Sequence, residues 1–178
     1  MSLVIVETAV EQPLSDEYLH DADQRIIPCL HARNILWLHS LLSIDRCRMI
    51  CMFDAPDAES VRDSYRRAGL FSRPTWTGDL IKLEVAQRQR DLAVRYVMEG
   101  TYPASSETNW SEISSKLHAC AEHNFEWLQA YLSRDRTRII CELNAPDINS
   151  VRQAQRYVGI DFDQIWVADL ITPLTATH

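Results

Sequence analysis

The chain has 178 residues, of which 46% are hydrophobic, so it can form a packed core and is not expected to be disordered. Its formal net charge of -7 argues against nucleic acids and anionic membranes as partners, because both are polyanions that the protein would repel. The first residues contain no basic segment and reach Glu7 quickly, which is unlike a signal peptide. The five cysteines include no CxxC pair and favour reduced thiols in the cytoplasm.

The chain contains two copies of one sequence pattern. Residues 34–81 align without a gap with residues 124–171, and 22 of these 48 positions are identical. Such identity indicates a tandem duplication. We expect a first repeat at 1–83, a polar linker at 84–91 and a second repeat at 92–178.

Each copy is predicted to begin with a strand, at 3–10 and 93–99, followed by an amphipathic helix. The apolar residues that recur at helical spacing are Leu19, Ala22, Ile26, Cys29 and Leu30 in the first copy, and Trp110, Ile113, Leu117, Cys120 and Ala121 in the second. Pro28 is expected to break or kink the first of these helices near its end.

Alternating residues and polar turns predict a β-hairpin next, then a second helix and a last strand. The hairpins are expected at 35–43 with 47–53 and at 125–133 with 137–143, and the last strands at 74–82 and 164–172. The second helices are expected to start after the caps Asp57 and Asp147 and to end at Gly69 and Gly159.

This order of elements is βαββαβ, the ferredoxin-like arrangement, and the fold class is α+β. Both faces of the predicted central strands are apolar: Met49, Cys51 and Phe53 point one way, and Ile50 and Met52 the other. We therefore expect the two sheets to face each other as an intrachain dimeric α/β barrel. The chain would be a monomer with an internal pseudo-twofold axis, and further oligomerisation stays open.

Facing sheets would enclose an apolar space with a few polar groups, the usual form of a ligand site. The residues expected to line it are Trp37, His39, Met52, Trp127, Gln129, Tyr131 and Glu142. The alternative is that these side chains are ordinary core residues. No catalytic dyad can be assigned.

Two further sets of residues recur in both copies. The first set consists of cysteines, namely Cys29 with Cys51 and their twins Cys120 with Cys141. These thiols could form a redox or soft-metal site, or they could simply pack as small hydrophobic side chains. The second set consists of arginine pairs, Arg62 with Arg66 and Arg152 with Arg156. Each pair could bind an anion or could belong to a helix face exposed to solvent.

The sequence resembles the nickel-binding-protein-like family of ferredoxin-like domains, otherwise known as a domain of unknown function. The residues that carry the resemblance are Trp37-Leu38-His39-Ser40, Met49-Ile50-Cys51, Ala55-Pro56-Asp57, Val61-Arg62 and Arg66-Arg67-Ala68-Gly69. The resemblance implies single units that pair as homodimers, here fused into one chain, and a divalent metal such as nickel. His39 with Glu7, Glu99 or Glu142 would hold the metal, while Gln129 replaces the histidine in the second copy.

We therefore expect a small soluble protein that binds a divalent metal or a small ligand between the two repeats. Two alternatives stay open: a cofactor-independent enzyme of the dimeric α/β-barrel type, and a structural or adaptor protein without a ligand.

Overall fold

The computed structural model describes residues 1–71, 73–82, 94–103, 110–118, 125–159 and 161–173. The chain divides into two compact units, residues 1–78 with 169–178 and residues 79–168. The expected linker 84–91 lies outside the described residues, and the repeat boundaries stay a prediction. Among the described residues, no helix is long and apolar enough to span a membrane.

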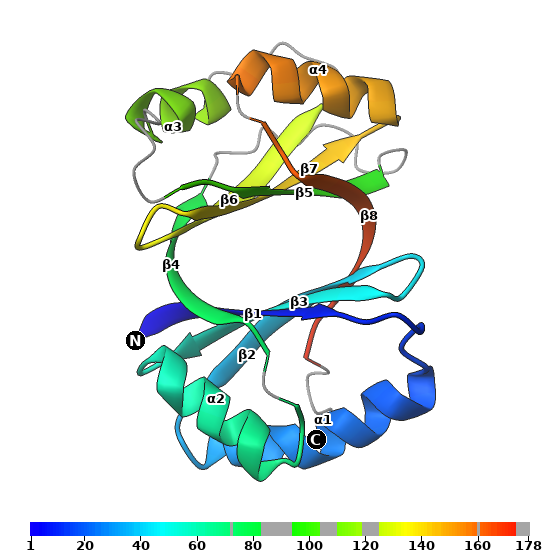
Figure 1. The fold of residues 1–178 in the computed structure, drawn as a ribbon, viewed down its shortest axis with the longest axis vertical. Coiled ribbons are helices and arrows are strands. Elements are labelled where there is room, and N and C mark those ends of the chain that lie inside the picture. The colour runs from blue at the N-terminus through cyan, green and yellow to red at the C-terminus, as the bar shows by residue number, and fades with distance from the viewer. Residues whose placement is uncertain (72, 83–93, 104–109, 119–124, 160, 174–178) are drawn as a thin grey trace. The chain divides into compact units, whose positions relative to one another are not determined.

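The first unit has the predicted order βαββαβ (Figure 1). Its elements are β1 (Ser2–Ala9), α1 (Asp16–His31), β2 (Leu36–Ser43), β3 (Arg48–Ala55), α2 (Ala58–Arg67) and β4 (Thr75–Lys82). Strand β1 pairs with β3 and β4, and β3 also pairs with β2, all antiparallel, so the strand order is β4-β1-β3-β2. This is the ferredoxin-like topology.

The second unit repeats the same order and topology. Its elements are β5 (Val94–Thr101), α3 (Trp110–His118), β6 (Glu126–Ser133), β7 (Arg138–Ala145), α4 (Ile148–Val158) and β8 (Gln164–Ile171). Residues 79–82 at the end of β4 group with the second unit, and residues 169–171 at the end of β8 group with the first. Strand β5 pairs with β7 and β8, and β7 pairs with β6, which gives the order β8-β5-β7-β6. The predicted α+β class with two ferredoxin-like repeats is confirmed.

In each unit both helices cover one face of the sheet, and the core lies between these two layers (Figure 1). In the first unit, Ile26 and Leu30 of α1 and Val61 of α2 pack against Cys51 and Phe53 of β3. Side chains alternate across a strand, so the neighbours of Cys51 along β3 point away from the helices.

Local sequence signals fix the turns and helix ends as predicted. Asp57 caps α2 by accepting a hydrogen bond from the Ser60 amide at 2.7 Å. Gly69 and Gly159 follow the second helices with φ of 67° and 72°, a backbone conformation that glycine adopts without strain. Pro28 does not break α1, which continues through this residue to His31, and the alternative of a kink stays a prediction.

Candidate ligand-binding site

A β-bulge in β2 decides which face of the sheet each predicted site residue occupies. The pairing with β3 shifts between Trp37, which lies opposite Phe53, and His39, which lies opposite Met52. Phe53 belongs to the core beneath the helices, whereas Met52 points to the other face. The expectation that Trp37 and His39 share one face is therefore wrong, because the bulge adds one residue between them.

The same bulge occurs in β6 of the second unit. Trp127 lies opposite Leu143 and packs in the core under the helices, whereas Gln129 lies opposite Glu142 on the other face. Tyr131, two residues after Gln129, shares its face. Of the predicted ligand-site residues in this unit, Gln129, Tyr131 and Glu142 lie together and Trp127 does not.

These three residues form a buried polar cluster with Arg95 of β5. The Glu142 side chain is 0% exposed and receives hydrogen bonds from Tyr131 Oη at 2.6 Å, Gln129 Nε2 at 2.9 Å and Arg95 Nη1 at 2.6 Å. Burial, and then the neighbouring Glu142 carboxylate, raise the pKa of Tyr131, so its hydroxyl stays a donor. The cluster satisfies its own central carboxylate, which is the arrangement of a structural network.

The first unit carries apolar residues at most of the same positions. The strand registers make Leu3, Met52, His39 and Leu41 the counterparts of Arg95, Glu142, Gln129 and Tyr131. Met52 and Leu41 are 0% exposed, as a close-packed apolar surface requires. The polar cluster is thus specific to the second unit.

The predicted metal ligands have other partners. The indole Nε1 of Trp76 donates a hydrogen bond to Glu7, and that of Trp166 donates one to Glu99. His39 lies opposite Met52, and β3 separates it from Glu7 on β1. In the part of the chain that the structure describes, no three His, Cys, Asp or Glu side chains are grouped to hold a metal ion. These donors therefore do not fit a nickel site.

The first unit contains a cavity between its helices and its sheet. Its volume is about 70 Å³, several times the ~10–15 Å³ that one water molecule needs. Helices α1 and α2, strands β2 and β3, and the segment after α2 all contribute to its walls. The lining residues are Tyr18, Leu19, Ala22, Asp23, Ile26, Ile27, Leu30, Trp37, Ser40, Met49, Cys51, Phe53, Tyr65, Leu70, Arg73 and Ile171.

Several polar groups lie deep in this mostly apolar wall. The Trp37 indole Nε1 donates to Ser40 Oγ at 2.9 Å, and the Tyr65 ring packs edge-on against Phe53 with centroids 6.3 Å apart. Burial raises the pKa of the Cys51 thiol to about 11, although hydrogen bonds with Ser40 and Tyr65 oppose the rise. Cys51 is therefore a neutral thiol at physiological pH, which makes it a weak nucleophile.

Two charged side chains also line the cavity. Arg73 donates a hydrogen bond from Nη2 to the Tyr18 hydroxyl at 3.3 Å. Burial raises the pKa of the Asp23 carboxyl, and the nearby His20 only partly opposes this. Among the described residues Asp23 forms no ion pair, so a carboxylate and a guanidinium face the cavity without neutralising each other.

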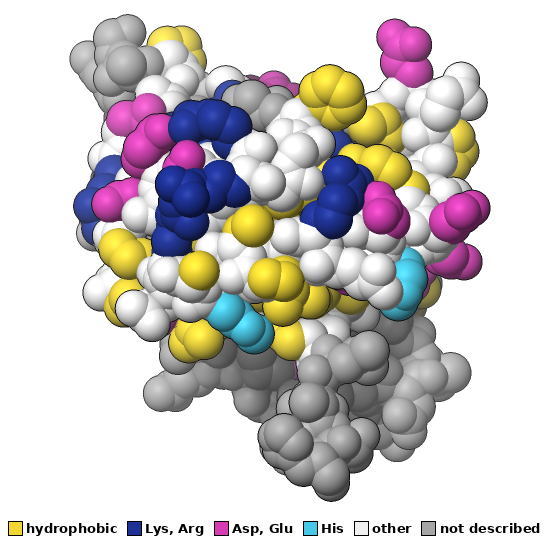
Figure 2. Space-filling model, turned by 90° about the horizontal axis from the view of Figure 1, so that it is seen from below, with side chains coloured by type: hydrophobic (Ala, Val, Ile, Leu, Met, Phe, Trp, Pro, Cys, Tyr) yellow, Lys and Arg dark blue, Asp and Glu magenta, His cyan; other side chains and the backbone are white. Residues whose placement is uncertain are grey.

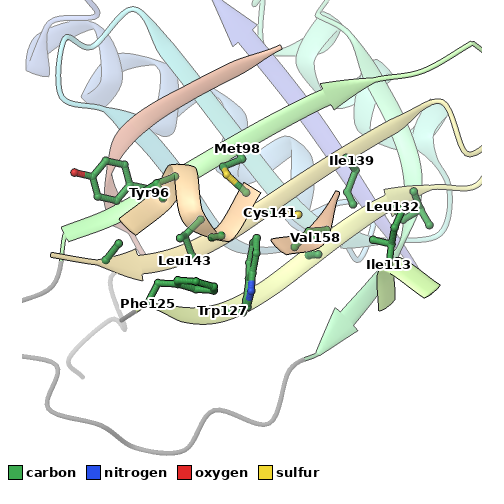
Figure 3. Close-up of a cluster of buried hydrophobic side chains, with 14 residues drawn as sticks. Tyr96, Met98, Ile113, Phe125, Trp127, Leu132, Ile139, Cys141, Leu143 and Val158 are labelled. Atoms are coloured by element: carbon green, nitrogen blue, oxygen red, sulfur yellow. The ribbon is translucent and has the colours of Figure 1, made fainter. Parts of the chain in front are cut away.

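The second unit has a cluster of buried hydrophobic side chains in the corresponding layer (Figure 3). Ile113 stands at the position of Ala22 and belongs to the buried cluster with Trp127 and Cys141. Ala130 replaces Ser40, which removes the acceptor for the indole, and among the described residues the buried Trp127 Nε1 has no hydrogen-bond partner. The change from alanine to isoleucine places a larger side chain in this layer of the second unit.

Sequence reasoning missed Arg95 and most of the cavity. Arg95 could have been found by extending the repeat alignment upstream from Glu7 and Glu99, because it replaces Leu3 just as Glu142 replaces Met52. The cavity could have been suspected from Ala22, which aligns with the larger Ile113.

Two ferredoxin-like repeats in one chain define this protein as a tandem ferredoxin-like α+β protein. A family model described as nickel responsive protein SCO4226-like matches the chain twice, at residues 4–73 and 96–167. The chain therefore belongs to the SCO4226-like family, and the resemblance seen in the sequence is confirmed. None of the functionally curated proteins matches the sequence.

Solved structures show similarity in fold. The structure of SCO4226 from Streptomyces coelicolor A3(2) is 18% identical, covers 42% of this chain and 91% of its own, and has a TM-score of 0.38. An anthrone oxidase-like protein is 7% identical over 97% of this chain and 91% of its own, with a TM-score of 0.52. A mutant chlorite dismutase from Candidatus Nitrospira defluvii is 8% identical with the same coverage and a TM-score of 0.51. At these identities the likeness concerns the fold alone.

Proposed function

We propose that the protein is a small-molecule binding protein and that the first unit holds the ligand in the cavity beneath α1 and α2. The observation that carries this proposal is the cavity itself: it has an apolar wall into which a few polar groups converge. The second unit carries Ile113 where the first unit has Ala22, and Ile113 belongs to its buried cluster.

The lining indicates the chemistry of the ligand. Trp37, Phe53 and Tyr65 offer aromatic surface, so the body of the ligand is apolar and small. Asp23 and Arg73 lie in the same wall, so the ligand carries polar groups that can meet both a carboxylate and a guanidinium. The neutral Cys51 thiol supports binding rather than covalent chemistry.

The description of the family names nickel, but this proposal rests on no metal. Glu7 and Glu99 accept hydrogen bonds from tryptophan side chains, and the described residues of the cavity include one cysteine and one aspartate but no histidine. Nickel prefers several converging nitrogen or oxygen donors, which these side chains do not supply.

The test is to fill the cavity with the residue of the twin unit. We expect small aromatic and aliphatic probes, for example indole, phenol and the apolar amino acids, to raise the melting temperature of the wild type. Ligand at about 100 times its Kd would stabilise the protein by about 2.7 kcal/mol. The Ala22→Ile variant should lose this effect because the added side chain occupies the space that the ligand needs.

The control is Gln24→Ile, which adds the same side chain to an exposed position of α1 that does not line the cavity. This variant should keep the stabilisation. Calorimetric titration of both variants measures binding directly. If no probe binds the wild type, or if Ala22→Ile binds as well as Gln24→Ile, the cavity is not the binding site.

A further inference from the structure

The arginines on the charged face of α2 in the first unit pair with carboxylates of the same helix. Arg62 and Arg66 pair with Glu59 at 3.1 Å and 3.3 Å. Asp63 pairs with Arg66 at 3.0 Å and with Arg67 at 3.1 Å. Figure 2 views the face covered by α1 and α2 and shows basic and acidic side chains next to one another there. The arginine pair of this helix is therefore already occupied by carboxylates.

Helix α4 keeps the two arginines but has lost these carboxylates. Arg152 and Arg156 correspond to Arg62 and Arg66, whereas Asn149 and Gln153 replace Glu59 and Asp63. Among the described residues, neither Arg152 nor Arg156 pairs with an acidic side chain. The Arg156 Nε donates a hydrogen bond to the Arg152 carbonyl oxygen at 3.3 Å.

The two arginines line a groove at the end of α4, together with Gln155, Gly159 and Asp161. The Lys116 ammonium of α3 lies near this groove, since a Cβ added to Gly159 would be 3.8 Å from Lys116 Nζ. Lys116 pairs with Glu112 at 2.8 Å, and Asp161 is the one carboxylate in the wall of the groove. The two arginines thus make the groove a local positive site on an acidic protein.

We propose that this groove of α4 binds the phosphate group of a small phosphorylated molecule. Side chains four residues apart on a helix are neighbours, so both guanidinium groups can reach one ligand. Each guanidinium group presents a planar pair of donors that matches two phosphate oxygens. Two guanidinium groups together carry two positive charges, so they bind a phosphate dianion better than they bind a single carboxylate. The Gln155 side-chain amide adds a neutral donor. Because the arginines are exposed, the affinity falls as the salt concentration rises.

The experiment titrates inorganic phosphate into the labelled protein and follows the amide resonances of α4 by NMR. Three variants decide the outcome. Arg152→Gln with Arg156→Gln should abolish the phosphate-dependent shifts. Asn149→Glu with Gln153→Asp restores the carboxylates of the twin helix and should lower the affinity about three- to tenfold. Arg62→Gln with Arg66→Gln, the matched change on α2, should leave binding unchanged.

Two further titrations separate the sources of the phosphate group. A nucleoside monophosphate should bind with at least the affinity of inorganic phosphate, while vesicles containing phosphatidic acid test a lipid headgroup and are not expected to bind the acidic protein. Circular dichroism confirms that each variant is folded. The proposal is overturned if phosphate shifts no resonance of α4, if the carboxylate-restoring variant binds as tightly as the wild type, or if the α2 control loses binding equally.

Discussion

The buried carboxylate of Glu142 allows a quantitative test of the polar cluster. Replacing Glu142 by methionine copies the residue that the first unit carries at this position, Met52. The substitution keeps the volume of the side chain approximately constant. It removes the acceptor for Tyr131, Gln129 and Arg95 at once.

The magnitude follows mainly from what Arg95 and Tyr131 lose. Removing one partner of a buried ion pair costs about 3–5 kcal/mol. The Arg95 side chain is 25% exposed, so water can replace part of the interaction that its guanidinium group loses. Tyr131 is 1% exposed, and an unsatisfied buried hydroxyl costs about 1–3 kcal/mol. We expect Glu142→Met to destabilise the second unit by about 3–5 kcal/mol.

The double variant Arg95→Leu with Glu142→Met removes both charges and copies both residues of the twin. We expect it to recover at least half of the loss, because an apolar pair can replace a buried ion pair at little net cost. Amide hydrogen exchange in β5 and β7 measures the opening free energy of this unit, and urea unfolding gives the global value. A single variant that costs less than ~1 kcal/mol, or a double variant less stable than the single one, would refute this account of the cluster.

Four further outcomes follow from the structure. Cys51 should be alkylated slowly in the native protein at pH 8, because burial raises its pKa to about 11, and mass spectrometry of the labelled peptides measures this. Gly159→Ala should destabilise the protein by about 1 kcal/mol in urea unfolding, since φ is +72° there. Ala130→Ser should raise the stability by about 0.5–1.5 kcal/mol if the new hydroxyl accepts the Trp127 indole bond, as judged by melting curves. The hydrogen bond from the Ser150 amide lowers the pKa of the capping Asp147 carboxyl. The ionised carboxylate therefore stabilises the folded protein above the ordinary carboxyl pKa, and this contribution is lost as the pH falls through the lowered pKa. Asp147→Ala should remove this contribution, so the free energy of unfolding should fall less steeply at acidic pH than in the wild type.

The sequence contains enough information for the topology because each boundary has a local cause. Asp57 and Gly69 mark the two ends of α2. Because the pattern occurs twice in the chain, each element is also predicted a second time by the other repeat. Helix α1 continues through Pro28 because, near the end of a helix, proline costs one backbone hydrogen bond without ending the helix.

The faces of the second strands could not be derived by the same reasoning. A strict period of two places Trp37 on the face of His39, and a single additional residue in the strand reverses this for every residue before the bulge. Nothing in the composition of 36–39 marks the bulge. The predicted ligand residues were therefore split between two faces, and the cavity beneath the helices, to which Trp37 belongs, was not foreseen.

The differences between the two units are correlated, and this bears on their origin. A glutamate placed alone at the position of Met52 would be a buried charge without partners, which costs several kcal/mol. In the second unit Glu142 is accompanied by Arg95 and Tyr131, each within 2.6 Å, while the first unit has Leu3 and Leu41 at their positions. Random loosening of a spare core would not produce a carboxylate together with its donors. The polar cluster of the second unit is therefore a concerted change of several residues on one face of the sheet, opposite to the face that the helices cover, and variants that exchange residues between twin positions can test it.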